Sequence, residues 1–148
     1  MRGRPLLPLI MVLSLGCGRN PAERLAGFRD ELVYEQLSFS PVTATQVGYH
    51  QHKGVNLDSI LDNLSQAELD RQRQFFRRFR ERLNGAVKPE QLTAEDRADY
   101  DLIGDQISVQ LLELDEIQNW RHSPTVYVEL IGNALFTPSI LEIPRSLS

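Results

Sequence analysis

The sequence predicts an all-α fold, a helical bundle with a central antiparallel helix hairpin. Apolar residues recur every three or four positions over long stretches, which is the spacing of one helix face. Residues that cap helix N-termini stand directly before several of these stretches. No segment alternates apolar and polar residues over a convincing strand length, and residues 125–131 come closest. A length of 148 residues suits one domain.

The N-terminus is predicted to be a cleavable signal peptide over residues 1–16. Arg2 and Arg4 form a short basic segment, and residues 6–15 form an apolar run of ten. As a helix, this run would span only about half of a ~30 Å hydrocarbon core, which favours a signal segment over a membrane anchor. The alternative is a buried N-terminal helix, but such a helix would show more polar positions than this run does.

Cys17 is the only cysteine, so the chain can form no intrachain disulfide. The segment Ser14-Leu15-Gly16-Cys17 resembles a bacterial lipoprotein cleavage box, with Ser14 where the box usually has Leu. We therefore expect Cys17 to be the first mature residue and to carry lipid. The protein would then be exported to the cell envelope or periplasm and anchored to a membrane through this lipid. The alternative is ordinary cleavage nearby, which leaves a free surface thiol.

The composition excludes two classes of protein. Hydrophobic residues make up 41% and charged residues 24% of the chain, which is ordinary for a globular protein and excludes wholesale disorder. The net charge is −4, and it falls to −6 without residues 1–16, because these contain Arg2 and Arg4 and no acid. Nucleic-acid phosphates need neutralising cations, so we expect no nucleic-acid partner.

A short linker and then several helices are predicted for the first part of the mature chain. Residues 17–22 are expected to form a short linker before a helical region over residues 23–148. Asn20 can cap a helix that has Pro21 at its first position and ends at Ser40-Pro41. The remaining short segments are a second helix to Val47, a loop over residues 48–56 and a helical turn over residues 57–64.

Two long helices form the predicted central hairpin. Ser65-x-x-Glu68 is a capping box, in which the two side chains can satisfy each other's backbone donors, and Asn84-Gly85 supplies a left-handed stop. Thr93-x-x-Asp96 opens the longest helix, over about residues 94–119. Six arginines lie between residues 68 and 82, and nine acids lie in residues 90–116. A short connection and complementary charge therefore predict antiparallel packing.

The longest helix has two apolar stripes. The first contains Tyr100, Ile103, Ile107, Leu111, Leu114 and Ile117, and the second contains Leu102, Val109, Leu112 and Trp120. A helix that is apolar over so much of its circumference is expected to be buried on more than one side. The few helices of this chain are not expected to cover both apolar stripes. We therefore expect that the natural protein continues beyond Ser148 and that this chain is a truncated fragment of a larger helical protein.

The arginine-rich helix has two interpretations. A basic face can bind a polyanion or anionic lipid. The alternative is a solvated helix face with local ion pairs such as Arg77–Glu81, each contributing about 0.3–0.5 kcal/mol. The acidic total charge favours the second interpretation.

The histidines and acids do not predict a complete site. His50-x-His52 could hold a metal only with a third ligand elsewhere, and His122 is the only other histidine, so we interpret the pair as polar loop residues. Asp96, Asp99, Asp101 and Asp105 lack the Gly and terminal Glu of a calcium loop. No nucleophile–base pair, phosphate-binding loop or dinucleotide motif is visible. No catalytic, cofactor-binding or metal-binding residue is therefore assigned.

A series of motifs together resembles a known family. They are Pro41-x-x-Ala44-Thr45-x-x-Gly48-x-His50, Leu57-Asp58, Leu92-x-x-x-Asp96-Arg97-x-Asp99-Tyr100-Asp101-Leu102, Trp120 and Pro124-x-x-Tyr127. Over about residues 23–148 their order and spacing resemble the N-terminal part of a large exported bacterial family, catalogued as domain of unknown function 885. The resemblance implies mostly helical proteins, several times longer than this chain and similar to gluzincin-type zinc metallopeptidases. Their His- and Glu-containing metal motif lies downstream, and none of its ligands maps onto this sequence.

Two functions are therefore expected. In the first, the chain is the N-terminal noncatalytic helical part of an exported zinc-dependent hydrolase, and its partner is the remainder of its own polypeptide. Zinc would then belong to the full-length protein and not to this chain. In the second, the chain is a complete small helical lipoprotein with a binding or structural role in the cell envelope. In both cases we expect residues 17–148 neither to bind zinc tightly nor to hydrolyse peptides.

Overall fold

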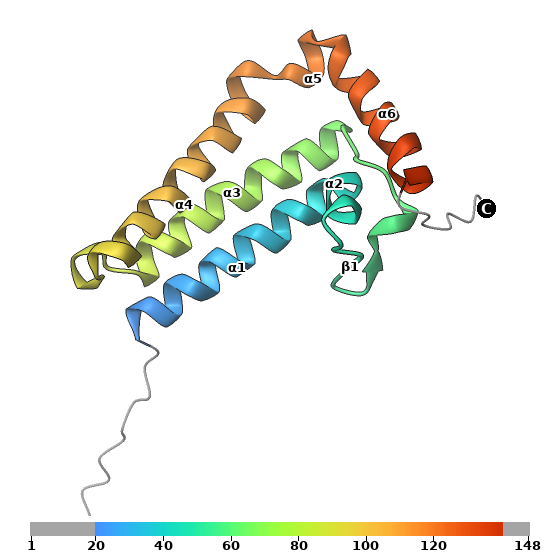
Figure 1. Cartoon of the computed structure of the whole chain (residues 1–148). Helices are drawn as coiled ribbons and strands as arrows, with labels where there is room; N and C mark the ends of the chain where they lie inside the picture. The colour runs from blue at the N-terminus through green and yellow to red at the C-terminus, as the bar shows by residue number, and fades with distance from the viewer. Residues whose placement is uncertain (1–19, 141–148) are drawn as a thin grey trace, which may run out of the picture.

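The computed structural model describes residues 20–140 and confirms an all-α protein (Figure 1). The helices are α1 Pro21–Phe39, α2 Pro41–Gln46, α3 Gln66–Ala86, α4 Ala94–Leu112, α5 Asn119–His122 and α6 Pro124–Ile140. A two-stranded antiparallel hairpin, β1 Gln51–His52 and β2 Val55–Asn56, follows α2. Short 3-10 turns lie at Leu57–Ser59 and Pro89–Gln91, and a π-helical turn at Glu113–Ile117 follows α4. Within the described residues, no helix is long and apolar enough to cross a membrane.

The predicted central hairpin is confirmed. α3 and α4 lie side by side and run antiparallel, and α1 packs against both (Figure 1). The core between them is built from Leu25, Leu32 and Phe39 of α1, Leu69, Phe76, Phe79 and Leu83 of α3, and Ile103 and Ile107 of α4. Full burial of one such side chain stabilises a fold by about 1.5–3 kcal/mol. This seam therefore holds the three long helices together.

The predicted caps at the helix N-termini are confirmed. A side-chain oxygen accepts a backbone N–H in each: Asn20 from Ala22 at 2.8 Å, Ser65 from Glu68 at 3.4 Å, and Thr93 from Asp96 at 3.1 Å. The predicted reciprocal half of the Ser65-x-x-Glu68 box is wrong. The Ser65 backbone N–H donates to Asn63, and the Glu68 carboxylate binds the Arg71 guanidinium instead.

The predicted stop at Asn84-Gly85 is also wrong. Gly85 keeps a helical conformation, and α3 ends one residue later at Ala86. Val87 then adopts an extended conformation while its N–H donates to the Leu83 carbonyl. The Val87 side chain is only 1% exposed, so its burial in the core, followed by Pro89, turns the chain out of the helix.

The longest helix differs from its prediction near the end. α4 stops at Leu112, and the chain continues through the π-helical turn, in which the Gln118 N–H donates to the Glu113 carbonyl at 2.8 Å. Gln118 is left-handed, with φ 52° and ψ 48°, and this reverses the chain before α5. Apolar spacing alone does not reveal such a turn, because the apolar residues of a π-helical turn still recur at nearly helical intervals.

The segment predicted as a loop over residues 48–56 contains the β hairpin. Its turn residues Lys53 and Gly54 both have positive φ, at 47° and 83°, which is the geometry of a two-residue type I′ turn. Glycine is usual in such a turn and lysine is not, so the residue pair Lys53-Gly54 is only a weak indication of a hairpin. Of the helical turn predicted over residues 57–64, only Leu57–Ser59 is helical.

Candidate functional site

A network of polar side chains surrounds the β hairpin, and its first part joins three residues of the family-like motifs. The Asp58 carboxylate oxygen Oδ1 lies 2.9 Å from His50 Nδ1 and accepts a hydrogen bond from the Thr45 hydroxyl at 2.7 Å. Because a carboxylate accepts but does not donate, the His50 Nδ1 atom carries the proton of this bond. Asp58 thus fixes the orientation of the imidazole through Nδ1, and Nε2 has no hydrogen-bond partner among residues 20–140.

The second part of the network lies at the base of the hairpin against α1. The His52 ring contacts the Tyr49 hydroxyl through Nδ1 at 2.9 Å, and its Nε2 lies 3.3 Å from a Glu35 carboxylate oxygen. The Lys53 ammonium also contacts Glu35, and Glu35 as a whole is only 8% exposed. Burial lowers the pKa of His52 below its ordinary value of 6.5, and the positive charge of Arg71 lowers it further. Because a lowered pKa favours the neutral form of His52, the positive charge that pairs with Glu35 comes from Lys53.

This network does not fit a zinc ion. His50 and His52 contact different carboxylates, Asp58 and Glu35, and His122 belongs to α5. Among residues 20–140, no group of three or more His, Cys, Asp or Glu side chains could hold a metal ion. His52 lies in β1 rather than in an open loop, and its side chain is only 13% exposed and contacts Glu35 of α1. No metal-dependent step is assigned to these residues.

The network also lacks an activated nucleophile. Thr45 is 1% exposed, and its hydroxyl donates to a carboxylate rather than to an imidazole base. The aspartates of α4 do not form a shared site either. Three of them have separate partners, namely Asp96 with Thr93, Asp99 with Arg29 and Asp101 with Arg97. The described residues thus build a polar structural network around the hairpin.

The arginines of α3 act mainly as links between helices. Arg82 binds Glu31 of α1 through two nitrogens, at 2.7 and 2.6 Å, and Arg80 donates to Ser108 of α4 at 3.0 Å. Arg77 donates to Asp115 at 2.9 Å, so its expected local pair with Glu81 is wrong. The interpretation of this face as a set of ion pairs rather than a polyanion site is supported, although most of the pairs connect different helices.

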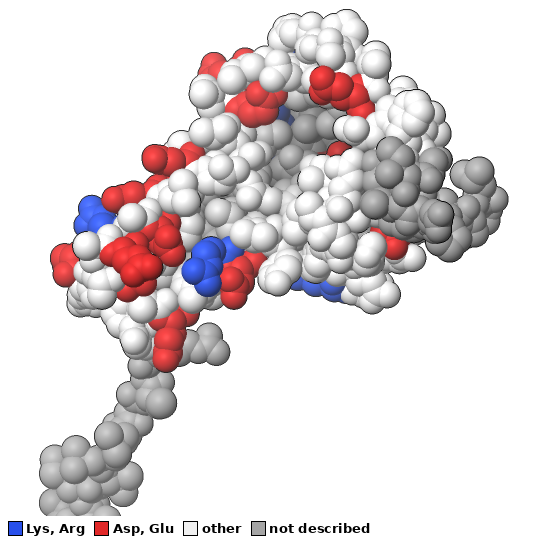
Figure 2. Space-filling view, in the orientation of Figure 1, with Lys and Arg blue, Asp and Glu red and all other residues white. Residues whose placement is uncertain are grey.

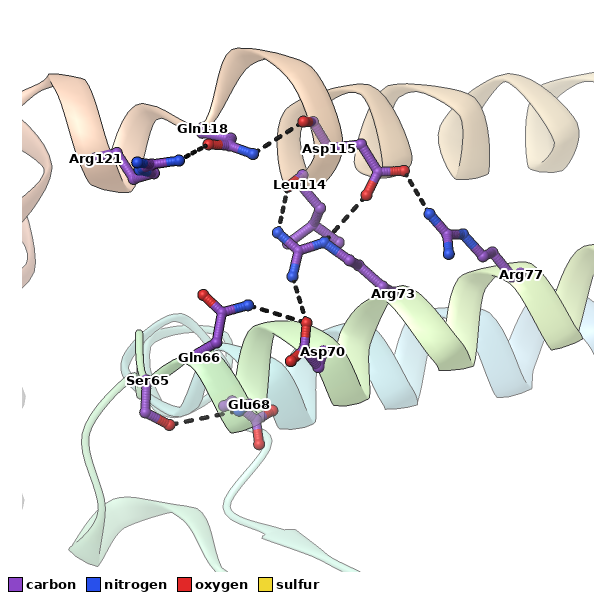
Figure 3. Close-up of polar contacts among 10 residues, drawn as sticks. All are labelled: Ser65, Gln66, Glu68, Asp70, Arg73, Arg77, Leu114, Asp115, Gln118 and Arg121. Atoms are coloured by element: carbon purple, nitrogen blue, oxygen red, sulfur yellow. Dashed lines mark hydrogen bonds and ion pairs between the residues drawn. The ribbon is translucent and has the colours of Figure 1, made fainter.

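One of these arginines fixes the elbow, which we define as the π-helical turn, Gln118 and α5 (Figure 3). The Arg73 guanidinium donates to the Leu114 carbonyl, to Asp115 at 3.0 Å and to Asp70 at 2.7 Å. The Gln118 side chain then donates to the Asp115 carbonyl at 2.9 Å. Arg73 is only 13% exposed, so these bonds are well shielded from water. The elbow sets the direction in which α6 leaves.

Beyond the elbow, α6 presents apolar side chains to solvent. It turns back toward α2 and packs against α2 and α5 (Figure 1). Val128, Ile131 and Phe136 are 69%, 56% and 68% exposed, and Glu129 is the only charged residue of the helix. Figure 2 shows acidic side chains gathered where α4 begins and a mostly uncharged surface over α6 on the face in view.

The second apolar stripe of α4 is open as well. Leu102, Val109 and Leu112 are 67%, 57% and 50% exposed, whereas Ile103 and Ile107 of the first stripe are buried. Within residues 20–140, α4 is therefore covered on one side only, as expected from the few helices of this chain; burial of its second stripe in a longer protein stays a prediction. We refer to these three residues of α4, together with Val128, Ile131 and Phe136 of α6, as the open apolar faces.

These features define the class of the protein as a helical unit with a closed three-helix core, a polar hairpin and open apolar faces. The chain belongs to the family described as bacterial protein of unknown function (DUF885), whose sequence model matches residues 41–140. The match covers the elbow, the open apolar faces and every network residue except Glu35. No curated protein and no solved structure matches the chain.

Glu35, Tyr49 and Lys53 were not predicted from the sequence, and the predicted lipidation site, Cys17, lies outside the described residues. A signal for Glu35 was present. It lies three residues after Leu32 and four before Phe39, so it is a charged residue on the apolar face of α1. A buried charge at such a position requires a partner, and the hairpin supplies it through Lys53.

Proposed function

We propose that this chain is the N-terminal, noncatalytic helical part of an exported zinc-dependent hydrolase that acts on peptides or similar amides. The open apolar faces are the observation that supports this proposal most. Large apolar side chains that are exposed together on one helix face often mark an interaction site, and burying the exposed part of each would contribute on the order of 1 kcal/mol. The remainder of the same polypeptide is the proposed partner, with apolar helices that cover α4 and α6.

The proposed zinc site belongs to that remainder. When bound there, the metal would supply an activated water for hydrolysis. The residues described here would hold the hairpin and the elbow in place and form one wall beside the catalytic part. Their separate carboxylate–histidine contacts are consistent with a structural task.

The first test is the reading frame past the codon for Ser148. A long open frame that encodes an H-E-x-x-H-like or E-x-x-x-x-H motif is the expected result. A stop codon directly after Ser148 would contradict the proposal. It would favour the alternative, a complete small helical lipoprotein that has a binding or structural role in the cell envelope.

The second test measures zinc on residues 17–148. Calorimetry and elemental analysis of the purified protein should show no stoichiometric zinc, and the protein should hydrolyse no peptide. A catalytic zinc ion takes three protein ligands at about 2.0–2.2 Å, which the separate contacts of His50 and His52 do not provide. Stoichiometric binding of submicromolar affinity, lost in His50→Ala, would show that the hairpin is a metal site after all.

We also propose that Cys17 becomes the first mature residue and carries lipid, which places the protein in the cell envelope. The apolar run at residues 6–15 and the cleavage-box-like segment before Cys17 support this. Expressed in a bacterium, the wild-type protein should partition into detergent, and Cys17→Ser should release it or block its processing. Equal processing and equal solubility of the two proteins would rule out lipidation and leave export untouched.

A further inference from the structure

A groove of about 310 Å³ lies where α1, α2, α3 and α4 meet, and neither the hairpin network nor the open apolar faces use it. Three of its lining residues are glutamines, each from a different long helix: Gln36 of α1, Gln72 of α3 and Gln110 of α4. We call this feature the glutamine groove. It lies toward the C-terminal ends of α1 and α4, whereas Arg29 in the middle of α1 pairs with Asp99 near the start of α4.

The three amide groups are available to a ligand. All three glutamines are half-buried, and in the part of the chain that the structure describes their side chains make no hydrogen bond. Each amide offers one acceptor oxygen and two donor hydrogens. Three such groups on separate rigid helices can bind both the C=O and the N–H groups of a ligand. Half-burial gives these bonds more weight than they would have on an open surface.

The other lining residues restrict the ligand class. No charged side chain lines the groove, so nothing there selects an anion or a cation. The floor is formed by Phe76 and Phe39, which are 1% and 8% exposed, and such buried rings offer no open face for stacking against a sugar. Val33 and Leu37 of α1 provide apolar contact along one side, and Val33 is 47% exposed.

We propose that the glutamine groove binds the main chain of an uncharged, extended peptide segment. The glutamine amides pair with peptide C=O and N–H groups, and small apolar side chains of the peptide contact Val33 and Leu37. This inference goes beyond the proposed function and does not depend on it, because it needs neither zinc nor any residue after the groove-forming helices.

The experiment is an NMR titration of the full chain, labelled with 15N, with the blocked peptide acetyl-tetraalanine amide. The side-chain NH₂ signals of Gln36, Gln72 and Gln110 should shift progressively, while the signal of Gln74, which is exposed on another face of α3, should not. The variant Gln72→Met keeps the length of the side chain but removes its hydrogen bonds, and it should weaken binding at least about tenfold. Gln74→Met is the matched control and should bind as the wild type does.

Three outcomes would overturn the proposal. The glutamine signals could remain unmoved up to millimolar peptide. They could move with a neutral oligosaccharide such as chitotriose and not with the peptide, which would make the groove a carbohydrate site. They could move equally with a peptide whose backbone nitrogens are methylated, which would exclude main-chain pairing. Gln36→Met and Gln110→Met provide independent variants if Gln72→Met does not fold.

Discussion

Asp62 shows at the scale of one residue how a buried charge serves the backbone. Its carboxylate oxygen accepts the N–H of Val42, in the first turn of α2, at 3.0 Å. Burial raises the pKa of Asp62 above its ordinary value of 3.8, and the hydrogen bond from Val42 offsets part of that rise. The folded protein therefore benefits from the acceptor oxygen and is destabilised by the charge. A neutral amide at this position would keep the acceptor oxygen and remove the charge.

Asp62→Asn is therefore expected to increase the free energy of unfolding at neutral pH. A raised pKa means that the folded state holds the proton more readily, so the wild type loses stability as pH rises through the folded pKa. The advantage of the variant should be largest at about pH 7 and should shrink as pH falls through the folded pKa toward about 4, because the wild-type carboxyl becomes protonated in both states only below its unfolded pKa. Urea unfolding of both proteins at several pH values measures this. A constant difference, or a loss at pH 7, would contradict it.

His52 should produce the opposite pH dependence. Its pKa is lowered by burial and by Arg71, so the folded state resists protonation, and stability should fall as pH drops from about 6.5 toward the lowered folded pKa. Tyr49, Glu35 and Lys53 also face this ring, and Glu35 opposes the effect.

The pH dependence of His52 is measured as the slope of unfolding free energy against pH between about 5 and 7. His52→Asn, which can still accept from Tyr49, should flatten the slope. His122→Asn, at an exposed histidine of α5, is the control and should leave the slope unchanged. An unchanged slope in His52→Asn would show that another group is responsible.

At the scale of the elements, the parts that could be predicted are those with local causes. The N-terminal caps at Asn20, Ser65 and Thr93 use oxygens within three residues of the N–H groups they satisfy, so a short pattern predicts them. The end of α3 depends on burial of Val87 among distant side chains, and the short sequence pattern Asn84-Gly85 was misleading there.

The hairpin and the elbow could not be predicted for the same physical reason. Lys53 adopts a positive φ in the turn of the hairpin while its ammonium contacts Glu35, eighteen residues earlier in the chain. Likewise, the Leu114 carbonyl in the π-helical turn is bound by Arg73 of another helix. Both distortions depend on partners remote in sequence. The candidate site was predicted in part: Thr45, His50 and Asp58 lie in the family-like motifs, whereas Glu35 and Tyr49, which contact His52, were not predicted.

Among the arginines of α3 that bind the elbow, Arg73 should cause the largest loss in the free energy of unfolding when it is replaced. It is 13% exposed and donates to three acceptors, so Arg73→Met leaves the largely buried Asp115 and the Leu114 carbonyl with fewer partners. We expect a loss of about 2 kcal/mol in the free energy of unfolding and faster amide exchange in α5. Arg77→Met is the matched control. Arg77 also binds Asp115 but is 60% exposed, so its removal should cost less than about 1 kcal/mol. Equal losses would show that the elbow does not depend on Arg73.

At the scale of the whole molecule, stability and open surface are separated. The closed core lies between α1, α3 and α4, and the buried aromatic residues Phe76 and Phe79 form its centre. The open apolar faces lie on the opposite side of α4 and on α6. Substitution on these faces should therefore affect association far more than folding of this chain.

The last prediction uses the triple variant Val128→Gln, Ile131→Gln and Phe136→Gln. In this chain it should change stability by less than about 0.5 kcal/mol per substitution, because all three side chains are more than half exposed and glutamine has the higher helix propensity. It should also reduce self-association in analytical ultracentrifugation and the binding of a hydrophobic dye. Ile107→Gln, in the closed core, is the contrasting variant and should cost about 3 kcal/mol or more. In a longer polypeptide that covers α6, the same triple variant would instead destabilise the protein by several kcal/mol, because it would place three amides in a buried interface. If the triple variant unfolds the present chain as Ile107→Gln does, then α6 is buried in solution and the open apolar faces are closed by the chain itself.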